Sequence, residues 1–201
     1  MPKLPLRRHG LEPFLAQLPQ DTSGDAGVTI QIQADLGHIN LRGSPENLEF
    51  VRIATNVLGQ ELPVIANTMA LGKLRIYWLG PNEWLILTSV DGTPQLVTLL
   101  REALQGQHAA VTELSGGQLA MSINGPRVRD VLAKGCTLDF HPAEFEVGAC
   151  AQSGLAKANI LIGLIDEKPV FEIVVRRSFA QYLVLWLEHA ATEYNVDFSV
   201  T

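Results

Sequence analysis

The chain has 201 residues, and 47% of them are hydrophobic, which suffices for one sizeable core or for two small units packed together. Its 15 Lys and Arg against 21 Asp and Glu give a formal net charge of −6, a balance that argues against nucleic acid as a partner. No stretch approaches the roughly 18 uninterrupted apolar residues of a membrane span, so we expect no membrane role.

Residues 1–27 are rich in Pro, Gly, Asp and Ser and carry little periodicity, so we expect a poorly ordered N-terminal arm. The arm lacks the apolar run and small-residue cleavage site of a signal peptide. The chain has two cysteines, Cys136 and Cys150. We expect a pair of reduced thiols in the cytoplasm, with a single disulfide between them as the alternative.

Alternating apolar residues at 28–33 predict a β-strand, and HINLRG (38–43) predicts a second strand or a continuation of the first. A helix follows. Ser44 is its expected N-cap, Pro45 its first residue and Gly59 the residue just past its end. Its expected apolar face consists of Phe50, Ile53, Ala54, Val57 and Leu58.

KLRIYWL (73–79) and EWLILTS (83–89) are predicted strands on either side of a turn at Gly80-Pro81-Asn82. The segment 94–105 is a predicted helix, and AAVTEL (109–114) is a closing strand. The expected apolar side of this helix consists of Leu96, Leu99, Leu100, Ala103 and Leu104.

The second half of the chain repeats this order of elements. Its predicted strands are QLAMSI (118–123), ACAQSGLA (149–156), ANILIGLI (158–165) and PVFEIVV (169–175), and its predicted helices are GPRVRDVLAKG (125–135) and SFAQYLVLWLEHAATEY (178–194). The repeated order predicts an α+β fold. Two ferredoxin-like βαββαβ units, residues 28–114 and 115–201, are fused into one compact body.

The helix at 125–135 carries Arg127 and Arg129 in its first turn, where cations oppose the helix dipole. We therefore expect a negative group nearby. It could be an acidic side chain of the same chain, such as Glu144 or Glu146, an acidic partner surface, or an anionic ligand. No glycine-rich loop precedes the helix, which favours an ion pair within the chain or with a partner over a phosphate site.

Two further pairs of charged residues belong to this region. Arg176 and Arg177 lie between the last predicted strand and the last helix, where they would extend the basic patch. Asp130 and Lys134 have the spacing and order of a stabilising i,i+4 ion pair.

Patterns for catalysis and metal binding are weak. Cys136 follows a helix C-terminus, which disfavours a reactive thiolate. Cys136 and His141 lack the paired Cys-x-x-Cys or His-x-x-x-His spacing of a metal site. Glu83 and Glu172 occupy matching places in the two halves, where isolated acids are usually solvated or ion-paired, and nothing pairs them for acid–base work. We therefore expect no catalytic, cofactor-binding or metal-binding residue in this chain.

The last helix is apolar nearly all round. Its expected core face is Phe179, Leu183, Leu187 and Ala190, which Tyr182 and Trp186 widen, while Val184 and Leu185 project away from it. We interpret these additional apolar side chains as an exposed surface that binds another chain. The alternative is that the helix lies at the centre of the domain. The same surface would let the isolated chain self-associate. The expected partner-contacting residues are Arg127, Arg129, Arg176, Arg177, Val184 and Leu185.

Four segments carry a resemblance to a known family: LGPNEWLIL (79–87), GPRVRDVLAKGCTLDFHPAEF (125–145), VGACAQSGLA (147–156) and FEIVVRRSFAQYLVLWLEHAATEY (171–194). They resemble the gamma subunit of heterotetrameric sarcosine oxidase over most of residues 79–194, while residues 1–60 carry little of the likeness. The wider group is similar to the folate-binding domain of glycine cleavage T-protein, in agreement with repeated ferredoxin-like units.

The resemblance implies a cytoplasmic complex with alpha, beta and delta subunits that oxidatively demethylates sarcosine to glycine. Hydrogen peroxide would form together with formaldehyde or, with tetrahydrofolate, its methylene derivative. The resemblance also implies that FAD, FMN and NAD belong to the alpha and beta subunits and zinc to the delta subunit. The gamma chain would have no cofactor of its own and would act in assembly and stability of the flavin-bearing subunits.

Lys134-Gly135-Cys136 begins a motif that folate-dependent relatives of T-protein complete with an aromatic residue and Gly-Gln-Glu. Thr137 follows here, so we transfer no folate-binding or catalytic residue. Two alternatives stay open. One is a stand-alone folate-binding or one-carbon transfer protein, with Arg127 and Arg129 holding a glutamate tail. The other is a plain binding module for a different partner.

Overall fold

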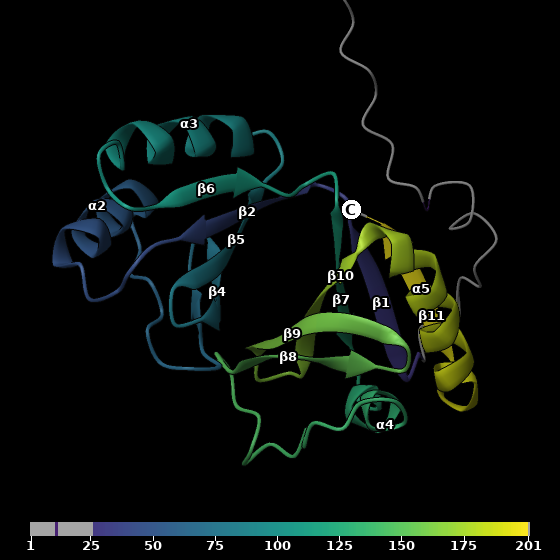
Figure 1. Ribbon diagram of the computed structural model, residues 1–201. Coiled ribbons are helices and arrows are strands. Elements are labelled where there is room, and N and C mark those ends of the chain that lie inside the picture. The colour runs from purple at the N-terminus through teal and green to yellow at the C-terminus, as the bar shows by residue number, and fades with distance from the viewer. Residues whose placement is uncertain (1–10, 12–25, 201) are drawn as a thin grey trace, which may run out of the picture.

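The computed structural model describes Leu11 and residues 26–200, so nearly all of the expected N-terminal arm, residues 1–27, lies outside the described residues. Two β-sheets lie against each other, and each carries helices on its outer side (Figure 1). The expected α+β fold class is confirmed.

The five-stranded sheet comes from the first half of the chain. Its strands, in spatial order, are β3 (Met69–Leu71), β4 (Arg75–Gly80), β5 (Glu83–Ser89), β2 (Leu36–Arg42) and β6 (Ala110–Glu113), and all neighbours are antiparallel. Helices α2 (Leu48–Leu58) and α3 (Thr93–Ala103) pack on its outer face. Apart from β3, which extends one edge, these elements have the arrangement of a ferredoxin-like unit.

The six-stranded sheet contains the strands of the second half. In spatial order they are β11 (Val196–Val200), β1 (Val28–Gln33), β7 (Gln118–Asn124), β10 (Val170–Arg176), β9 (Ala158–Asp166) and β8 (Cys150–Leu155). Helices α4 (Val128–Ala133) and α5 (Arg177–Ala191) pack on its outer face, and a short 3₁₀ turn, η1 (Thr192–Tyr194), leads into β11.

Strand β1 does not follow the expected division into residues 28–114 and 115–201. It is inserted into the sheet of the second half, parallel to β11 on one side and antiparallel to β7 on the other. The apolar alternation in this segment predicts a strand correctly. It does not specify the neighbouring strands, because pairing is made by backbone groups at the strand edges and not by the faces that the alternation describes.

Helix α2 begins later than predicted, because Asn47 and not Ser44 is its N-cap. The side-chain oxygen of Asn47 accepts hydrogen bonds from the backbone N–H groups of Glu49 (3.1 Å) and Phe50 (3.2 Å). Ser44 instead accepts a backbone bond from Asn47 N at 3.2 Å, so Pro45 lies in a turn before the helix.

Two glycines follow helices for different reasons. Gly59 ends α2 as predicted, in the left-handed conformation with φ 65°. Gly135 follows α4 without adopting that conformation. A Cβ atom at this position would lie 2.4 Å from the Trp186 ring, so the close packing of α4 against α5 requires a glycine here.

The buried face of α3 is displaced from the predicted one. Val97, Leu100 and Leu104 are buried against the sheet, whereas Leu99 is 46% exposed and Ala103 is exposed as well. The helix covers the sheet with one side only, so its run of consecutive apolar residues cannot all face the core.

A separate cluster fills the space between the two sheets. Its buried members are Met69, Tyr77, Leu85, Leu87, Ala120, Cys150, Leu161 and Val174. Along one edge the sheets are joined by backbone hydrogen bonds from Met69 N to Gly148 O and from Cys150 N to Asn67 O, both 2.8 Å. Away from that edge the chain crosses between the sheets twice, after β1 and after β6.

Replacing Asn47 by Ala removes the acceptor for two first-turn N–H groups of α2. We expect the free energy of unfolding to fall by about 1 kcal/mol, as for other N-cap residues. Urea denaturation followed by circular dichroism measures the loss. Ser44→Ala is the matched control and should change stability by less than about 0.5 kcal/mol. Equal losses in the two variants would contradict the N-cap assignment.

Candidate functional site

The four candidate arginines do not form one patch. Arg127 and Arg129 lie at the start of α4, just after the last residue of β7. Arg176 and Arg177 lie where β10 runs into α5, and Arg176 pairs with the first residue of β7. The two pairs therefore lie at opposite ends of β7. The expectation that Arg176 and Arg177 extend the patch around Arg127 was wrong.

Arg127 finds its negative partner within its own helix. Its Nη1 lies 3.3 Å from Asp130 Oδ2, and its guanidinium group lies over the Tyr194 ring, 5.6 Å from the ring centroid. The predicted partner of Asp130, Lys134, instead pairs with Glu193 and lies over the same tyrosine ring at 4.8 Å. The Lys134 ammonium, through a hydrogen bond to the carboxylate, holds the pKa of Glu193 below its ordinary value.

Arg129 is half-buried and also satisfied inside the chain. It donates a hydrogen bond to the backbone carbonyl of Phe140, and its guanidinium group lies over the Phe171 ring at 5.2 Å from the centroid. Neither Glu144 nor Glu146 is the partner that we expected. Because Asp130, Phe140 and the aromatic rings already engage both arginines of α4, their position no longer calls for an external anion such as a folate glutamate tail.

Val184 and Leu185 are neighbours in α5, and both were expected to contact a partner, but they lie on different sides of the helix. Val184 is fully buried in the core (0% exposed), so the prediction that it contacts a partner was wrong. Leu185 is 44% exposed, and Phe179, which was expected in the core, is 41% exposed. Together with half-buried Tyr182 and Trp186 they form an apolar strip on the outer side of the helix, which we call the α5 strip.

Glu172 lies fully buried between the sheets, on β10. Its Oε2 accepts a hydrogen bond from Tyr77 Oη at 2.5 Å and lies 2.8 Å from Arg75 Nε, both on β4. Burial raises the pKa of Glu172, and the charge of Arg75 offsets part of that rise. The matching residue of the first half, Glu83, is instead partly exposed and pairs with Arg42 at 3.3 Å. Glu172 is therefore ion-paired as expected, but it is not solvated.

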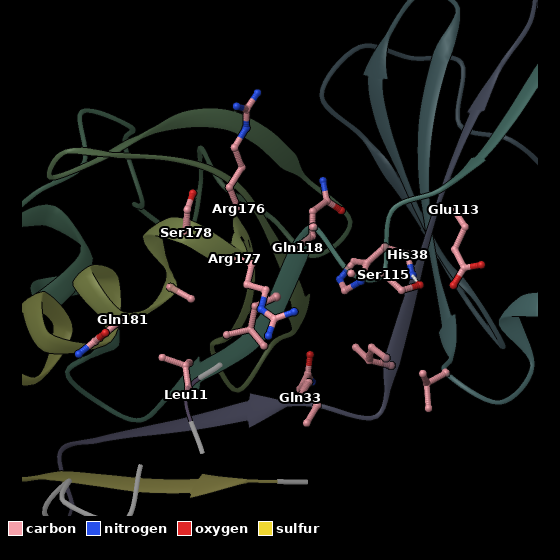
Figure 2. Close-up of a pocket in the computed structure, with 17 residues that line it drawn as sticks. Leu11, Gln33, His38, Glu113, Ser115, Gln118, Arg176, Arg177, Ser178 and Gln181 are labelled. Carbon is pink, nitrogen blue, oxygen red and sulfur yellow. Dashed lines mark hydrogen bonds between the residues drawn. The ribbon is translucent and has the colours of Figure 1, made fainter. Parts of the chain in front are cut away.

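A pocket of about 880 Å³ opens where the chain crosses between the sheets (Figure 2). The ends of β1 and β6, the starts of β2 and β7, and the first turn of α5 all contribute to its walls. Its polar lining includes Gln33, His38, Ser115, Gln118 and Arg177. Of these, only Arg177 was singled out from the sequence.

His38 is the most enclosed of these polar residues, at 2% exposed. Its backbone N–H donates to Ser115 Oγ at 3.1 Å, but neither ring nitrogen has a hydrogen-bond partner among the residues that the structure describes. Burial lowers the pKa of His38 to about 4, so the ring is neutral at neutral pH. In the sequence, His38 alternates with the buried Ile39 and Leu41, a pattern that usually places the polar residue in solvent.

Both cysteines are buried free thiols, in agreement with the reduced pair expected from the sequence. Burial raises the pKa of Cys150 to about 12, so this thiol stays protonated at neutral pH. Cys136 Sγ lies 3.5 Å from Ser153 Oγ.

Within the described part of the chain, no three His, Cys, Asp or Glu side chains are grouped as a metal site would require. No helix there has the length and apolar character to cross a bilayer.

The arrangement of two packed sheets with outer helices places the chain in the fold class of glycine cleavage T-protein. Against glycine cleavage system aminomethyltransferase T from Bartonella henselae, it gives a TM-score of 0.65 at 16% identity. The likeness covers 87% of this chain and 48% of that protein, and it shows the shared fold.

Within this fold class, the sarcosine oxidase, gamma subunit family matches residues 42–193, and the chain belongs to that family. Sarcosine oxidase subunit gamma from Corynebacterium sp. (strain U-96) is 29% identical over 177 residues, which is 87% of this chain and 84% of that one. The subunit from an Arthrobacter species is 29% identical over 191 residues, with 94% and 92% covered.

The structural comparison agrees. A chain of the heterotetrameric sarcosine oxidase from Corynebacterium sp. U-96, solved in complex with pyrrole 2-carboxylate, matches with a TM-score of 0.85 at 29% identity. The match covers 94% of this chain and 96% of that chain. The resemblance inferred from the sequence is therefore confirmed.

Tyr77→Phe removes the hydroxyl group that donates to buried Glu172. We expect the free energy of unfolding at neutral pH to fall by about 2 kcal/mol, because a hydrogen bond to a buried charged group is lost. Urea denaturation measures the change. Tyr182→Phe is the control, since its hydroxyl accepts a 3.3 Å bond from Lys157 N near the surface. If the Tyr77 variant lost no more stability than this control, the buried bond would not contribute as described.

His38→Gln should flatten the pH dependence of stability. The folded chain keeps His38 neutral down to a pKa of about 4, while the unfolded chain takes up that proton near the ordinary value of 6.5. As the pH falls through this interval the wild-type protein should lose up to roughly 3 kcal/mol that the variant keeps. Urea titrations between neutral pH and pH 4 measure both curves, with His141→Gln as an exposed control. Parallel curves for wild type and His38→Gln would contradict the assignment.

Proposed function

We propose that this chain is the gamma subunit of a heterotetrameric sarcosine oxidase and that its role is to bind and stabilise the subunits that carry the catalysis. The observation that carries the proposal is the match to a chain of the Corynebacterium complex, at a TM-score of 0.85 over nearly the whole of both chains.

The remaining parts of the proposal come from the resemblance. The partners are alpha, beta and delta subunits in a cytoplasmic complex that converts sarcosine to glycine. FAD, FMN and NAD belong to the alpha and beta subunits and zinc to the delta subunit. The gamma chain contributes no catalytic residue of its own. The proposal is supported by its buried polar groups: Glu172 is engaged by Tyr77 and Arg75, and the thiol of Cys150 is held protonated.

The α5 strip is the surface that we assign to a companion subunit. Phe179 and Leu185 are 41% and 44% exposed, and the half-buried rings of Tyr182 and Trp186 lie with them along the helix. Aromatic and apolar anchors of this kind are typical of the centre of a protein interface. The exposed side chain of Arg176, just before the same helix, would lie at the polar rim. We do not assign Arg127 and Arg129 to the partner interface, because their contacts lie within the chain.

Co-expression with the alpha, beta and delta subunits tests the proposal. We expect a tagged gamma chain to co-purify with yellow, active oxidase, whereas the same chain expressed alone should be colourless and should not oxidise sarcosine. Leu185→Asp should weaken subunit binding by at least about tenfold, because a charge would be buried in the apolar centre of the interface.

Leu99→Asp is the matched control, since Leu99 is 46% exposed on α3, on the other side of the molecule. It should bind the companion subunits like the wild type. Failure of the wild-type chain to co-purify, or sarcosine oxidation by the chain alone, would refute the proposed role. Equal binding by Leu185→Asp and wild type would remove the α5 strip from the interface while leaving the subunit assignment intact. The oligomeric state of the isolated chain shows whether the strip also supports self-association.

A further inference from the structure

The pocket where the chain crosses between the sheets has a polar lining that packing alone does not explain. Its volume of about 880 Å³ lies within the size range of small-molecule sites. Leu36 and Val90 contribute apolar walls. Gln33, His38 and Gln118 come to the same pocket from three different strands, β1, β2 and β7 (Figure 2).

These three polar side chains carry atoms without hydrogen-bond partners. Within the part of the chain that the structure describes, Gln33 Oε1, Gln118 Oε1 and both ring nitrogens of His38 are buried and unpaired. His38 is the most enclosed of the three, at 2% exposed. Buried polar atoms are nearly always satisfied, so a group of orphaned atoms around one cavity indicates that a bound molecule supplies their partners.

The topology brings the three side chains close together. Gln33 is the register partner of Ala120, two residues beyond Gln118, so the two glutamines lie on the same face of the sheet as diagonal neighbours. Residues related in this way are about 7–8 Å apart, within reach of one small molecule. His38, from the other sheet, is held at the turn before Gln118, because its backbone N–H donates to Ser115 Oγ at 3.1 Å.

The orphaned atoms define which chemical groups would complement them. The Gln33 side chain donates a hydrogen bond to the buried Glu172, so its amide nitrogen is engaged and its oxygen remains as an acceptor. The Gln118 oxygen is a second acceptor, and the neutral ring of His38 offers one donor and one acceptor. A complementary ligand therefore carries at least two donors and one acceptor.

The lining also favours a ligand without net charge. Its charged residues, Glu113, Arg176 and Arg177, are all exposed, so solvent screens their charges. The buried part of the lining consists of neutral polar and apolar side chains. An ionic group bound there would lose its hydration without gaining a buried counter-charge.

We infer that the pocket binds a small neutral carboxamide. Its amino group would donate to the oxygens of Gln33 and Gln118, its carbonyl group would accept from His38, and its apolar remainder would lie against Leu36 and Val90. The orphaned atoms are shielded from solvent, so the ligand would reach them through small side-chain rotations, which are common on binding. This inference does not depend on the proposed role as a subunit.

Isothermal titration calorimetry on the full chain tests the site with three probes of similar shape. Benzamide carries the two donors and the acceptor. Acetophenone keeps the ring and the carbonyl group but has a methyl group in place of the amino group, and benzoate is charged and donates no hydrogen bond. We expect one benzamide per chain, bound at least about tenfold more tightly than acetophenone or benzoate, because neither of these can donate to the two glutamine oxygens.

Two variants locate the binding. Gln118→Met replaces one orphaned oxygen by an apolar side chain of similar length, so it should weaken benzamide binding at least about fivefold and leave acetophenone binding unchanged. Gln95→Met is the matched control, because Gln95 is exposed on α3 and does not line the pocket, and it should bind benzamide like the wild type. Circular dichroism checks that both variants are folded.

No benzamide binding at millimolar concentration would overturn the inference. Equal affinity for acetophenone or benzoate would do the same and requires no variant, so the wild-type chain decides even if Gln118→Met does not fold. An unchanged affinity of a folded Gln118→Met chain would also count against the site. None of these outcomes bears on co-purification with the companion subunits, so the failure of one proposal is distinguishable from the failure of the other.

Discussion

The hydrogen bond between Tyr77 and buried Glu172 is the constraint on which the arrangement of the two sheets depends. It joins β4 of one sheet to β10 of the other at 2.5 Å, beside the ion pair of Glu172 with Arg75 and the apolar cluster between the sheets. A buried carboxylate is costly without its partners, so these contacts favour the relative position of the sheets in which Tyr77 and Arg75 reach Glu172. That position brings the backbone edges around Met69 and Cys150 within hydrogen-bonding distance. The pocket lies away from these edges, where the chain crosses between the sheets.

Much of the fold could be predicted because periodicity reports which face of an element is buried. Most strands of both halves, the helices α2, α3, α4 and α5, and the turn after Gly80 were expected from the sequence. Two edge strands were not predicted: β3 has three residues, and β11 follows α5 and η1 with a bend at Asn195, whose φ is 54°. The strands that pair with β1 were not predicted either, because side-chain alternation carries no information about which backbone edges meet.

The candidate site was less predictable, since it depends on distances between segments far apart in the chain. Leu185 and Val184 are adjacent and similar in sequence, yet their exposures are 44% and 0%, because a rotation of about 100° separates neighbours on a helix. Arg127 was expected to have a negative group nearby, and it does. That group is Asp130, which was expected to pair with Lys134. The sequence did not show that His38 is buried, because the alternation of a strand does not distinguish a side chain in solvent from one in a cavity between sheets.

The pairing of β1 with β11 has a consequence for synthesis of the chain. Val28 lies beside Val196, so the strand near one terminus is completed by the strand at the other. The five-stranded sheet can form while the ribosome is still translating the second half, but β1 keeps an unpaired edge until β11 has emerged. Such an edge invites pairing with a foreign strand. Shielding of this segment by a chaperone during translation would therefore protect the nascent protein from aggregation.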